Sequence, residues 1–181
     1  MTAVFGGSFS PVHIGHMEVA AGVLRNRLAD AVMMMPCRLN PLKDGSGLMA
    51  DSDRLDMLEK AVNYYKKGED LNIWIDTLEL RMPLPSYTVS TMRILSANFP
   101  EERFRLIAGA DSYMDFRRWR DWEELERDFA PIVYPRPGYD IEELRPGWTL
   151  LRGVRETDIS STRLRQMLAR GEDVGAYMPW L

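Results

Sequence analysis

The chain contains two histidines, His13 and His16, which lie three residues apart behind a turn that begins at Gly6-Gly7. On the first turn of a helix this spacing places both imidazoles on one face. Glycine lets a backbone approach a ligand closely, and a helix N-terminus offers unpaired N–H groups that favour phosphate. The pair is therefore suited to donate to phosphate oxygens and to stabilise charge in a transition state, and bound phosphates would favour the charged imidazoles.

Two other roles are open to the histidine pair. Polar residues of this kind often do no more than satisfy a loop. Metal binding is the second alternative, but no cysteine or carboxylate nearby completes an evident ligand set. We therefore expect no protein-bound metal at this turn.

A second polar run, Ser160-Ser161-Thr162, begins another predicted helix that carries Arg163 and Arg165 in its first turns. A capped helix would explain the hydroxyl groups alone. A guanidinium beside them, together with the free N–H groups of a helix start, makes an anion site. Two such sites at two helix starts could hold one triphosphate between them.

Three further side chains are candidates for ligand contacts. Lys43 lies within a long loop, 36–50, where it is either a mobile cation for phosphates or a solvated lysine. Asp111 follows a predicted strand and could accept a hydrogen bond from a ribose hydroxyl or a substrate amide, or simply cap a helix. Trp119 belongs to an aromatic stripe that is typical of a core, yet it could stack on a planar ring.

An α/β framework would bring these residues together. Apolar runs of strand length alternate with amphipathic helical patterns, which predicts a doubly wound, Rossmann-like parallel sheet of about five strands with a small C-terminal helical tail. The predicted strands are 2–5, 31–35, 71–75, 104–108 and 132–134, with short extended pieces at 76–81 and 148–151. Predicted helices follow the glycine turn and occupy about 51–68, 88–98, 112–117, 121–128 and 160–170, with a last one near Asp173.

This topology places the candidate residues at one edge of the sheet. Doubly wound sheets bind ligands at the carboxyl ends of their strands, where the strand order reverses. The first predicted strand ends on the glycine–histidine stretch and the fourth ends on Gly109-Ala110-Asp111, so we expect the two ends side by side. No linker or repeat divides the sequence, so we expect one domain, 1–181.

Composition excludes several classes of partner. A net charge of −4 over 181 residues argues against nucleic acid, no apolar run is long enough to cross a membrane, and no secretory signal is evident. One cysteine, Cys37, suits a reducing cytoplasm.

The glycine turn carries neither a Walker-type lysine nor the motif Gly-x-Gly-x-x-Gly, so a P-loop ATPase and a dinucleotide-dependent dehydrogenase are both disfavoured. The sequence leaves open whether the chain forms a homo-oligomer.

Two motifs carry a family resemblance. The first is Gly6-Gly7-Ser8-Phe9-x-Pro11-x-His13-x-Gly15-His16 and the second is Ile159-Ser160-Ser161-Thr162-x-Leu164-Arg165, and together they resemble the signatures of the nucleotidylyltransferase superfamily. Five further segments resemble the nicotinate-nucleotide adenylyltransferase branch of that superfamily. They are Asn40-Pro41-Leu42-Lys43, Pro85-Ser86-Tyr87-Thr88, Gly109-Ala110-Asp111, Trp119-x-x-Trp122 and Pro135-Arg136-Pro137-Gly138-Tyr139. One position departs from the pattern, because Ser10 stands where the family more often has Asp or Asn.

The resemblance implies a division of roles. His13 and His16 would contact the phosphates of ATP, with His16 nearest the α-phosphate, and Lys43 would assist. The ATP site would comprise Gly6, Gly7, Ser8, Phe9, His13, Gly15, His16, Ser160, Ser161 and Arg165, of which Ser160, Ser161 and Arg165 would hold the β- and γ-phosphates. Thr88, Asp111 and Trp119 would line the place of the mononucleotide, with Arg136 nearby in an unassigned role.

The implied reaction is the transfer of AMP from ATP to nicotinate mononucleotide, which gives deamido-NAD and pyrophosphate in NAD biosynthesis. Mg²⁺ would bridge the phosphates and be held mainly by them and by water. Nicotinamide mononucleotide is the first alternative acceptor, ahead of phosphopantetheine or a sugar phosphate. A non-catalytic nucleotide sensor on the same fold is the alternative from another class.

Overall fold

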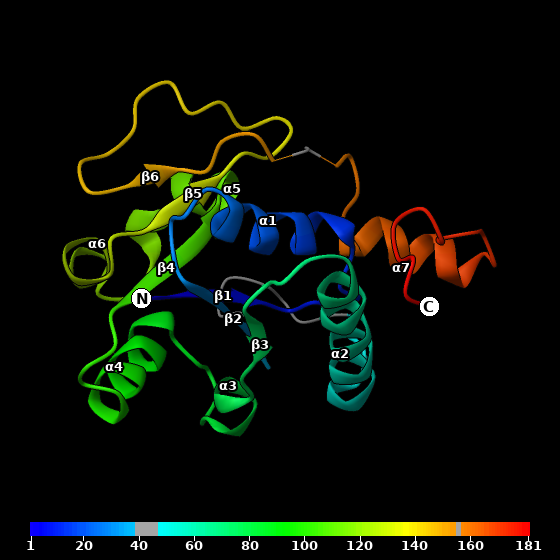
Figure 1. Ribbon diagram of the computed structural model, residues 1–181, viewed down its shortest axis with the longest axis horizontal. Helices are drawn as coiled ribbons and strands as arrows, with labels where there is room; N and C mark the ends of the chain where they lie inside the picture. Colours follow the sequence, from blue (N-terminus) through cyan, green and yellow to red (C-terminus); the bar gives the residue numbers. More distant parts are fainter. Residues whose placement is uncertain (39–46, 155–156) are drawn as a thin grey trace.

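The computed structural model describes residues 1–38, 47–154 and 157–181, and its centre is a parallel six-stranded sheet (Figure 1). The strand order is β3-β2-β1-β4-β5-β6, and every neighbouring pair is parallel. The strands are β1 (Thr2–Gly7), β2 (Ala31–Pro36), β3 (Ile73–Ile75), β4 (Phe104–Gly109), β5 (Ile132–Tyr134) and β6 (Thr149–Leu150). The predicted doubly wound class is confirmed, with the 148–151 piece as the sixth strand.

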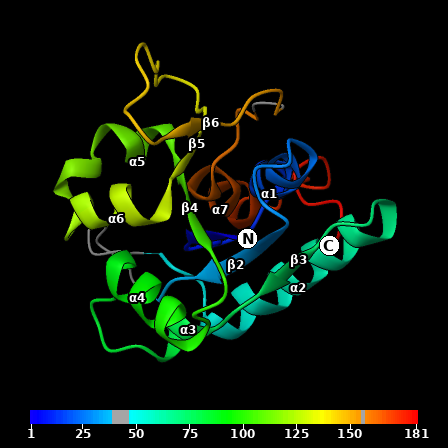
Figure 2. The same cartoon turned by 60° about the vertical axis from the view of Figure 1, so that its left-hand side comes forward.

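Helices cover both faces of the sheet (Figure 2). Side chains of α1 (Ile14–Arg25) and α2 (Asp51–Gly68) form one core cluster with the sheet, and those of α4 (Thr88–Asn98), α5 (Ala110–Met114) and α6 (Trp122–Phe129) form a second. Successive side chains of β1 point to opposite faces of the sheet, so Ala3 and Phe5 belong to the first cluster and Val4 belongs to the second. The remaining helices are α3 (Leu78–Arg81), the 3-10 helix η1 (Phe116–Arg118) and α7 (Ser161–Ala169). Within the described ranges, no helix has the length and apolar character to cross a bilayer.

The strand order reverses at β1, and this reversal positions the site. β1 pairs with β2 on one side and with β4 on the other, and Phe5 lies opposite Ile107. The turn after β1 and the Gly109-Ala110-Asp111 segment after β4 therefore leave the same edge of the sheet side by side, as the sequence predicted. A crevice at such a reversal is the usual ligand site of an open α/β sheet.

Two local predictions are wrong. Residues 78–81 form helix α3 rather than an extended piece, because the carboxylate of Asp76 accepts a hydrogen bond from the N–H of Leu78 (2.8 Å) and starts a helical turn. Near Asp173 the chain forms turns rather than a helix, in which the N–H groups of Tyr177 and Met178 both donate to the carbonyl of Val174.

Candidate active site

A cavity of about 500 Å³ opens at the carboxyl ends of β1 and β4, and we call it the central cavity. It gathers most of the predicted site residues from distant parts of the sequence. The predicted residues that line it are Gly6, Gly7, Ser8, Phe9, His13, His16, Asp111, Trp119, Arg136, Ser160, Ser161 and Arg165. Gly15 and Thr88 line the two neighbouring pockets, and Lys43 lies outside the described residues.

The turn after β1 is shaped by close packing. Phe9 is buried and has a positive φ of 42°, and its ring lies so near Gly7 that a Cβ there would sit 3.0 Å from Cζ. Gly6 differs, because a Cβ at that position would meet nothing within 4 Å. Packing within the protein therefore explains Gly7, whereas the open space at Gly6 belongs to the cavity and is available to a ligand.

His13 is the N-cap of α1 and His16 lies in the helix's first turn, and their ring centroids are 3.8 Å apart. The backbone N–H of His13 donates to Nδ1 of His16 (3.2 Å). A neutral imidazole that accepts at Nδ1 carries its proton at Nε2, so this bond makes Nε2 of His16 a donor. The ring of His16 also packs edge-on against Phe9 at 5.1 Å, which fixes its orientation.

Burial controls the charge of His13. Its side chain is 4% exposed, and burial, followed by the nearby Arg136 guanidinium, lowers its pKa to about 4. Nδ1 of His13 has no hydrogen-bond partner among the described residues. Without a nucleotide the imidazole is therefore neutral at pH 7, and the charged form expected from the sequence requires bound phosphate.

Helix α7 is tied directly to the glycine turn. Arg165 donates to the carbonyl of Ser10 (2.5 Å), and the hydroxyl of Ser161 donates to the carbonyl of Pro11 (2.9 Å). The Ser160 hydroxyl caps α7 by accepting from the N–H of Arg163. The two predicted anion sites thus form one structure with a shared wall.

Ser10, the residue that departs from the family pattern, is fully buried in this turn. Its hydroxyl accepts from the backbone N–H of Met49 (2.9 Å), so it links the turn to the segment that leads into α2. The side chain therefore supports the wall of the cavity.

Asp111 and Arg136 form an ion pair on the β4–β5 side of the central cavity, with 3.1 Å between nitrogen and oxygen. Arg136 also lies over the ring of Tyr134, 5.6 Å from its centroid, and burial raises the pKa of that tyrosine. Gly109 leaves room for the pair, because a Cβ there would lie 2.5 Å from the Asp111 carboxylate. The pair presents one anion and one cation, each about one-third exposed, to a polar ligand.

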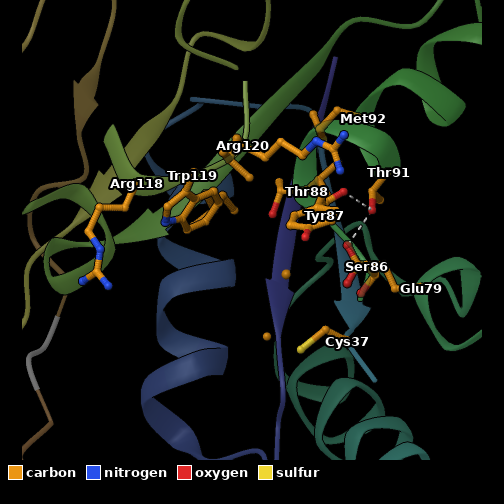
Figure 3. A pocket seen from close by; sticks show the side chains of 15 residues that line it. Cys37, Glu79, Ser86, Tyr87, Thr88, Thr91, Met92, Arg118, Trp119 and Arg120 are labelled. Atoms are coloured by element: carbon orange, nitrogen blue, oxygen red, sulfur yellow. Dashed lines mark hydrogen bonds between the residues drawn. The ribbon is translucent and has the colours of Figure 1, made fainter. Parts of the chain in front are cut away.

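A second pocket of about 120 Å³, which we call the tryptophan pocket, adjoins the central cavity and shares Gly6, Gly7 and Trp119 with it. Figure 3 shows the Trp119 ring on one side and Tyr87, Ser86 and Glu79 on the other. Trp119 itself rests on Phe116, with 5.1 Å between centroids. Trp119, the side chain predicted to stack on a ring, is thus a partly buried residue that packs against the second core cluster and lines the pocket.

Sequence reasoning did not identify several residues of the tryptophan pocket as site residues, namely Cys37, Glu79, Ser86, Tyr87, Arg118 and Arg120. Ser86 and Tyr87 stand inside the quoted Pro85–Thr88 motif, which was a signal for their position. Glu79 and Arg120 gave no pattern of their own, because only the packing of α3 against β2, and of the segment after η1 beside Tyr87, brings them to the pocket.

A third pocket of about 230 Å³ lies on the opposite side of the histidines, and we call it the proline pocket after Pro135 and Pro137. It shares His13, His16 and Ser160 with the central cavity. Gly15 borders it, and a Cβ there would come within 2.4 Å of the Thr157 hydroxyl. The sequence predicted Gly15, His13, His16 and Ser160 for the ATP site, but it did not predict a separate pocket beside them.

Beneath the glycine turn lies Arg54, a fully buried side chain on α2 with 1% exposure. Its guanidinium donates to the carbonyls of Ser8 (2.6 Å) and Cys37 (2.7 Å) and to the carboxylate of Asp51 (2.5 Å). Sequence reasoning missed it, although an arginine four residues before Leu58 on the apolar face of a helix was a usable signal. Arg54 fixes the turn after β1 against the end of β2.

Metal ligands are not clustered in the described part of the chain, where no group of three or more His, Cys, Asp or Glu side chains could hold an ion. Asp111, the carboxylate of the central cavity, is already paired with Arg136.

Comparisons with known proteins agree with this architecture. A model of the cytidylyltransferase-like family matches residues 4–167. A protein of Porphyromonas gingivalis named "Probable nicotinate-nucleotide adenylyltransferase" is 33% identical over 181 residues, covering 99% of this chain and 89% of that protein. A protein of the same name from Chlorobium luteolum is 35% identical, covering 98% and 90%.

The fold also matches a solved structure. Nicotinic acid mononucleotide adenylyltransferase of Plasmodium falciparum, complexed with NaAD, superposes with a TM-score of 0.82 at 21% identity. The match covers 98% of this chain and 89% of that one.

Proposed function

The chain belongs to the cytidylyltransferase-like family. From this membership together with its relatives of 33% and 35% identity, we infer that it is a nicotinate-nucleotide adenylyltransferase. It transfers the adenylyl group of ATP to nicotinate mononucleotide and releases pyrophosphate. The product is deamido-NAD, so the reaction belongs to NAD biosynthesis.

The assignment of substrates to places rests on one observation, namely that the central cavity joins the two smaller pockets. The central cavity shares Trp119 with the tryptophan pocket and His13 and His16 with the proline pocket. Phosphates in the central cavity can therefore join a base on each side. An arrangement of base, phosphates and second base is what two nucleotides need when their phosphates react with each other.

The chemical step needs positioning and charge stabilisation rather than a protein nucleophile. An oxygen of the 5′-phosphate of nicotinate mononucleotide attacks the α-phosphorus of ATP in line. The new P–O bond forms as the bond from the α-phosphorus to the bridging oxygen breaks, and pyrophosphate leaves with that oxygen. The residues of the central cavity hold the two phosphates in this arrangement.

His16 would donate from Nε2 to an oxygen of the α-phosphate, because its Nδ1 is occupied by the N–H of His13. His13 would contact the neighbouring phosphate oxygens, whose negative charge raises the pKa of its buried imidazole. Gly6 would allow the backbone to lie against the ligand. Negative charge that grows on the phosphates is thereby met by donors already in place.

The start of α7 would hold the β- and γ-phosphates through Ser160, Ser161 and Arg165. Arg165 and Ser161 already bond to the turn after β1, which fixes both groups before the nucleotide arrives. A preordered guanidinium loses little freedom on binding. Lys43, outside the described residues, would add a further positive charge.

The pyridine ring would stack on Trp119 in the tryptophan pocket, with Thr88 at the start of α4 beside it. Asp111 would accept hydrogen bonds from a ribose hydroxyl, and Arg136 would orient it through their ion pair. The adenine would lie in the proline pocket, where Ile159 and the two prolines provide apolar contact. Each base then has an apolar wall on its own side of the reacting phosphates.

ATP would enter as its complex with a divalent cation, for which we propose Mg²⁺. The ion neutralises part of the triphosphate charge when bound, and the phosphates and water supply its ligands. The protein's own contribution is the cationic and N–H-rich wall around the phosphates.

We also propose a cytoplasmic location, because the reaction consumes ATP and the chain carries a single thiol, Cys37. Nicotinamide mononucleotide is the alternative acceptor with the most similar shape. Pyrophosphate release in the presence of ATP and Mg²⁺ tests the function when each acceptor is supplied in turn. Turnover with nicotinate mononucleotide is expected, and no turnover with either pyridine nucleotide would refute the proposal.

A further inference from the structure

The tryptophan pocket has a positive electrostatic bias. Its described lining includes one carboxylic acid, Glu79, and two guanidinium groups, Arg118 and Arg120. Glu79 is buried, which raises its pKa, and it accepts a hydrogen bond from the Thr91 hydroxyl (2.7 Å). Its negative charge is therefore disfavoured where a ligand would bind.

The two arginines differ in how far their charge is already balanced. Arg118 lies 3.5 Å from the carboxylate of Asp115. Arg120 instead lies over the ring of Tyr87, 4.8 Å from its centroid, and no carboxylate of the described chain is within 4 Å of it. In Figure 3 the Arg120 side chain extends over Tyr87 toward the start of α4. Its charge is thus available to a ligand of the pocket.

Ser86 adds an unsatisfied polar group to the same pocket. The residue is 5% exposed, it lines the pocket, and its hydroxyl has no hydrogen-bond partner among the described residues. The neighbouring carboxyl of Glu79 takes its hydrogen bond from Thr91 instead. Buried hydroxyl groups are normally hydrogen-bonded, so this one is set to bond to a ligand.

We propose that Ser86 and Arg120 are specificity-determining residues that select an acceptor with a carboxylate, rather than an amide, on its pyridine ring. The Ser86 hydroxyl donates to the carboxylate, and Arg120 contributes the attractive charge at the rim of the pocket. This inference rests on the proposed function, since it concerns the choice between two acceptors of the same reaction.

Charge distinguishes the two acceptors. A hydroxyl that donates to a carboxylate makes a charge-assisted bond about twice as strong as one to a neutral amide. An arginine that is not paired attracts the carboxylate and has no comparable attraction for the amide. Both side chains therefore favour the acid, while stacking on Trp119 serves both ring systems equally.

The test is the specificity constant kcat/KM for nicotinate and for nicotinamide mononucleotide in single variants. Ser86→Ala is expected to lower the value for the acid about tenfold and to affect the amide less. Arg120→Gln is expected to lower it about fivefold for the acid and to leave the amide within about twofold, with partial recovery in Arg120→Lys. The KM for ATP should not change.

Matched controls come from the adjoining elements, since Ser86 precedes α4 and Arg120 follows η1. Ser90→Ala removes a hydroxyl from α4 outside the three pockets, and Arg117→Gln removes one charge from η1 outside them. Both should keep the ratio of the two specificity constants. Calorimetric titration of each variant with nicotinate mononucleotide alone gives a readout that does not depend on turnover.

Equal losses for both acceptors, or no loss for the acid in Ser86→Ala and Arg120→Gln, would overturn this inference while leaving the reaction intact. Absence of turnover with either acceptor in the unmodified chain would instead refute the proposed function.

Discussion

Arg165 donates a hydrogen bond of 2.5 Å to the carbonyl oxygen of Ser10, and so joins residues 155 positions apart in the sequence. The glycine turn and the start of α7 are two separate motifs in the chain but one wall in the structure. Ser161 strengthens the wall through the carbonyl of Pro11. A displacement of either motif would therefore move the other.

Replacement of His16 by alanine should lower kcat about a hundredfold or more, the usual effect of losing a donor to a transition state. His16→Asn is the informative companion, because its side-chain oxygen can accept the N–H of His13 in place of Nδ1 while Nε2 is lost. Both variants should be similarly slow, with an unchanged unfolding temperature. Full activity in His16→Asn would show that Nε2 does not act on the phosphate.

Gly6→Ala should separate binding from stability. A methyl group there meets no protein atom within 4 Å, so the free energy of unfolding should stay within about 0.5 kcal/mol of the original value. The methyl would project into space shared by two pockets and should raise KM for the substrates. Gly15→Ala is the contrasting variant, because its Cβ would press on Thr157 and should destabilise the fold. Unchanged KM values in Gly6→Ala would contradict a ligand at this glycine.

The buried imidazole of His13 makes stability depend on pH. Its pKa is about 4 in the native chain, against the ordinary histidine value of 6.5 that applies once the chain is unfolded, so between these values the unfolded chain binds a proton that the native chain does not. The free energy of unfolding should therefore fall as pH decreases from about 6.5 to about 4, by ~3 kcal/mol from this residue. His13→Asn should lose this component of the slope in denaturant titrations at about pH 4.5, 5.5 and 6.5. Identical slopes in the two proteins would exclude a neutral buried His13.

Arg54→Met should destabilise the chain by ~3 kcal/mol or more, because it leaves the carbonyls of Ser8 and Cys37 without their donor. Arg54→Lys should recover part of the loss, since one ammonium cannot reproduce the planar fork. Lys60→Met on the same helix is the control, as its exposed pair with Asp56 should contribute ~0.5 kcal/mol or less. Equal unfolding midpoints for Arg54→Met and the control would show that the buried guanidinium does not support the turn.

The sequence predicted the sheet class and the edge that carries the site, because both follow from short-range patterns. The apolar runs and the Gly6–His16 turn contain their own periodicity and turn signals. The polar start of α7 is similarly local. Their meeting at one cavity followed from the rule for ligand sites in doubly wound sheets.

The missed features have two kinds of cause, because the helix at 78–81 depends on a local contact whereas the roles of Arg54 and Ser86 depend on tertiary contacts. Residues 78–81 form a helix rather than an extended piece because the Asp76 carboxylate accepts a hydrogen bond from the N–H of Leu78, an interaction within a few residues that a strand pattern does not reveal. Arg54 and Ser86 gave no motif for their roles, because one is defined by the carbonyls it reaches and the other by the absence of a partner among the described residues. Such properties exist only once the chain has folded.

The N–H of Ile14, the first residue of α1, donates to the carbonyl of Tyr177, which lies after α7 (2.9 Å). This contact has a consequence for the order of events during synthesis. The β1 strand and its turn are translated well before α7 and Tyr177, which complete them. Contacts of such sequence separation form late, so a nascent chain that has not yet exposed α7 and Tyr177 can build the sheet while its central cavity still lacks the wall that α7 supplies.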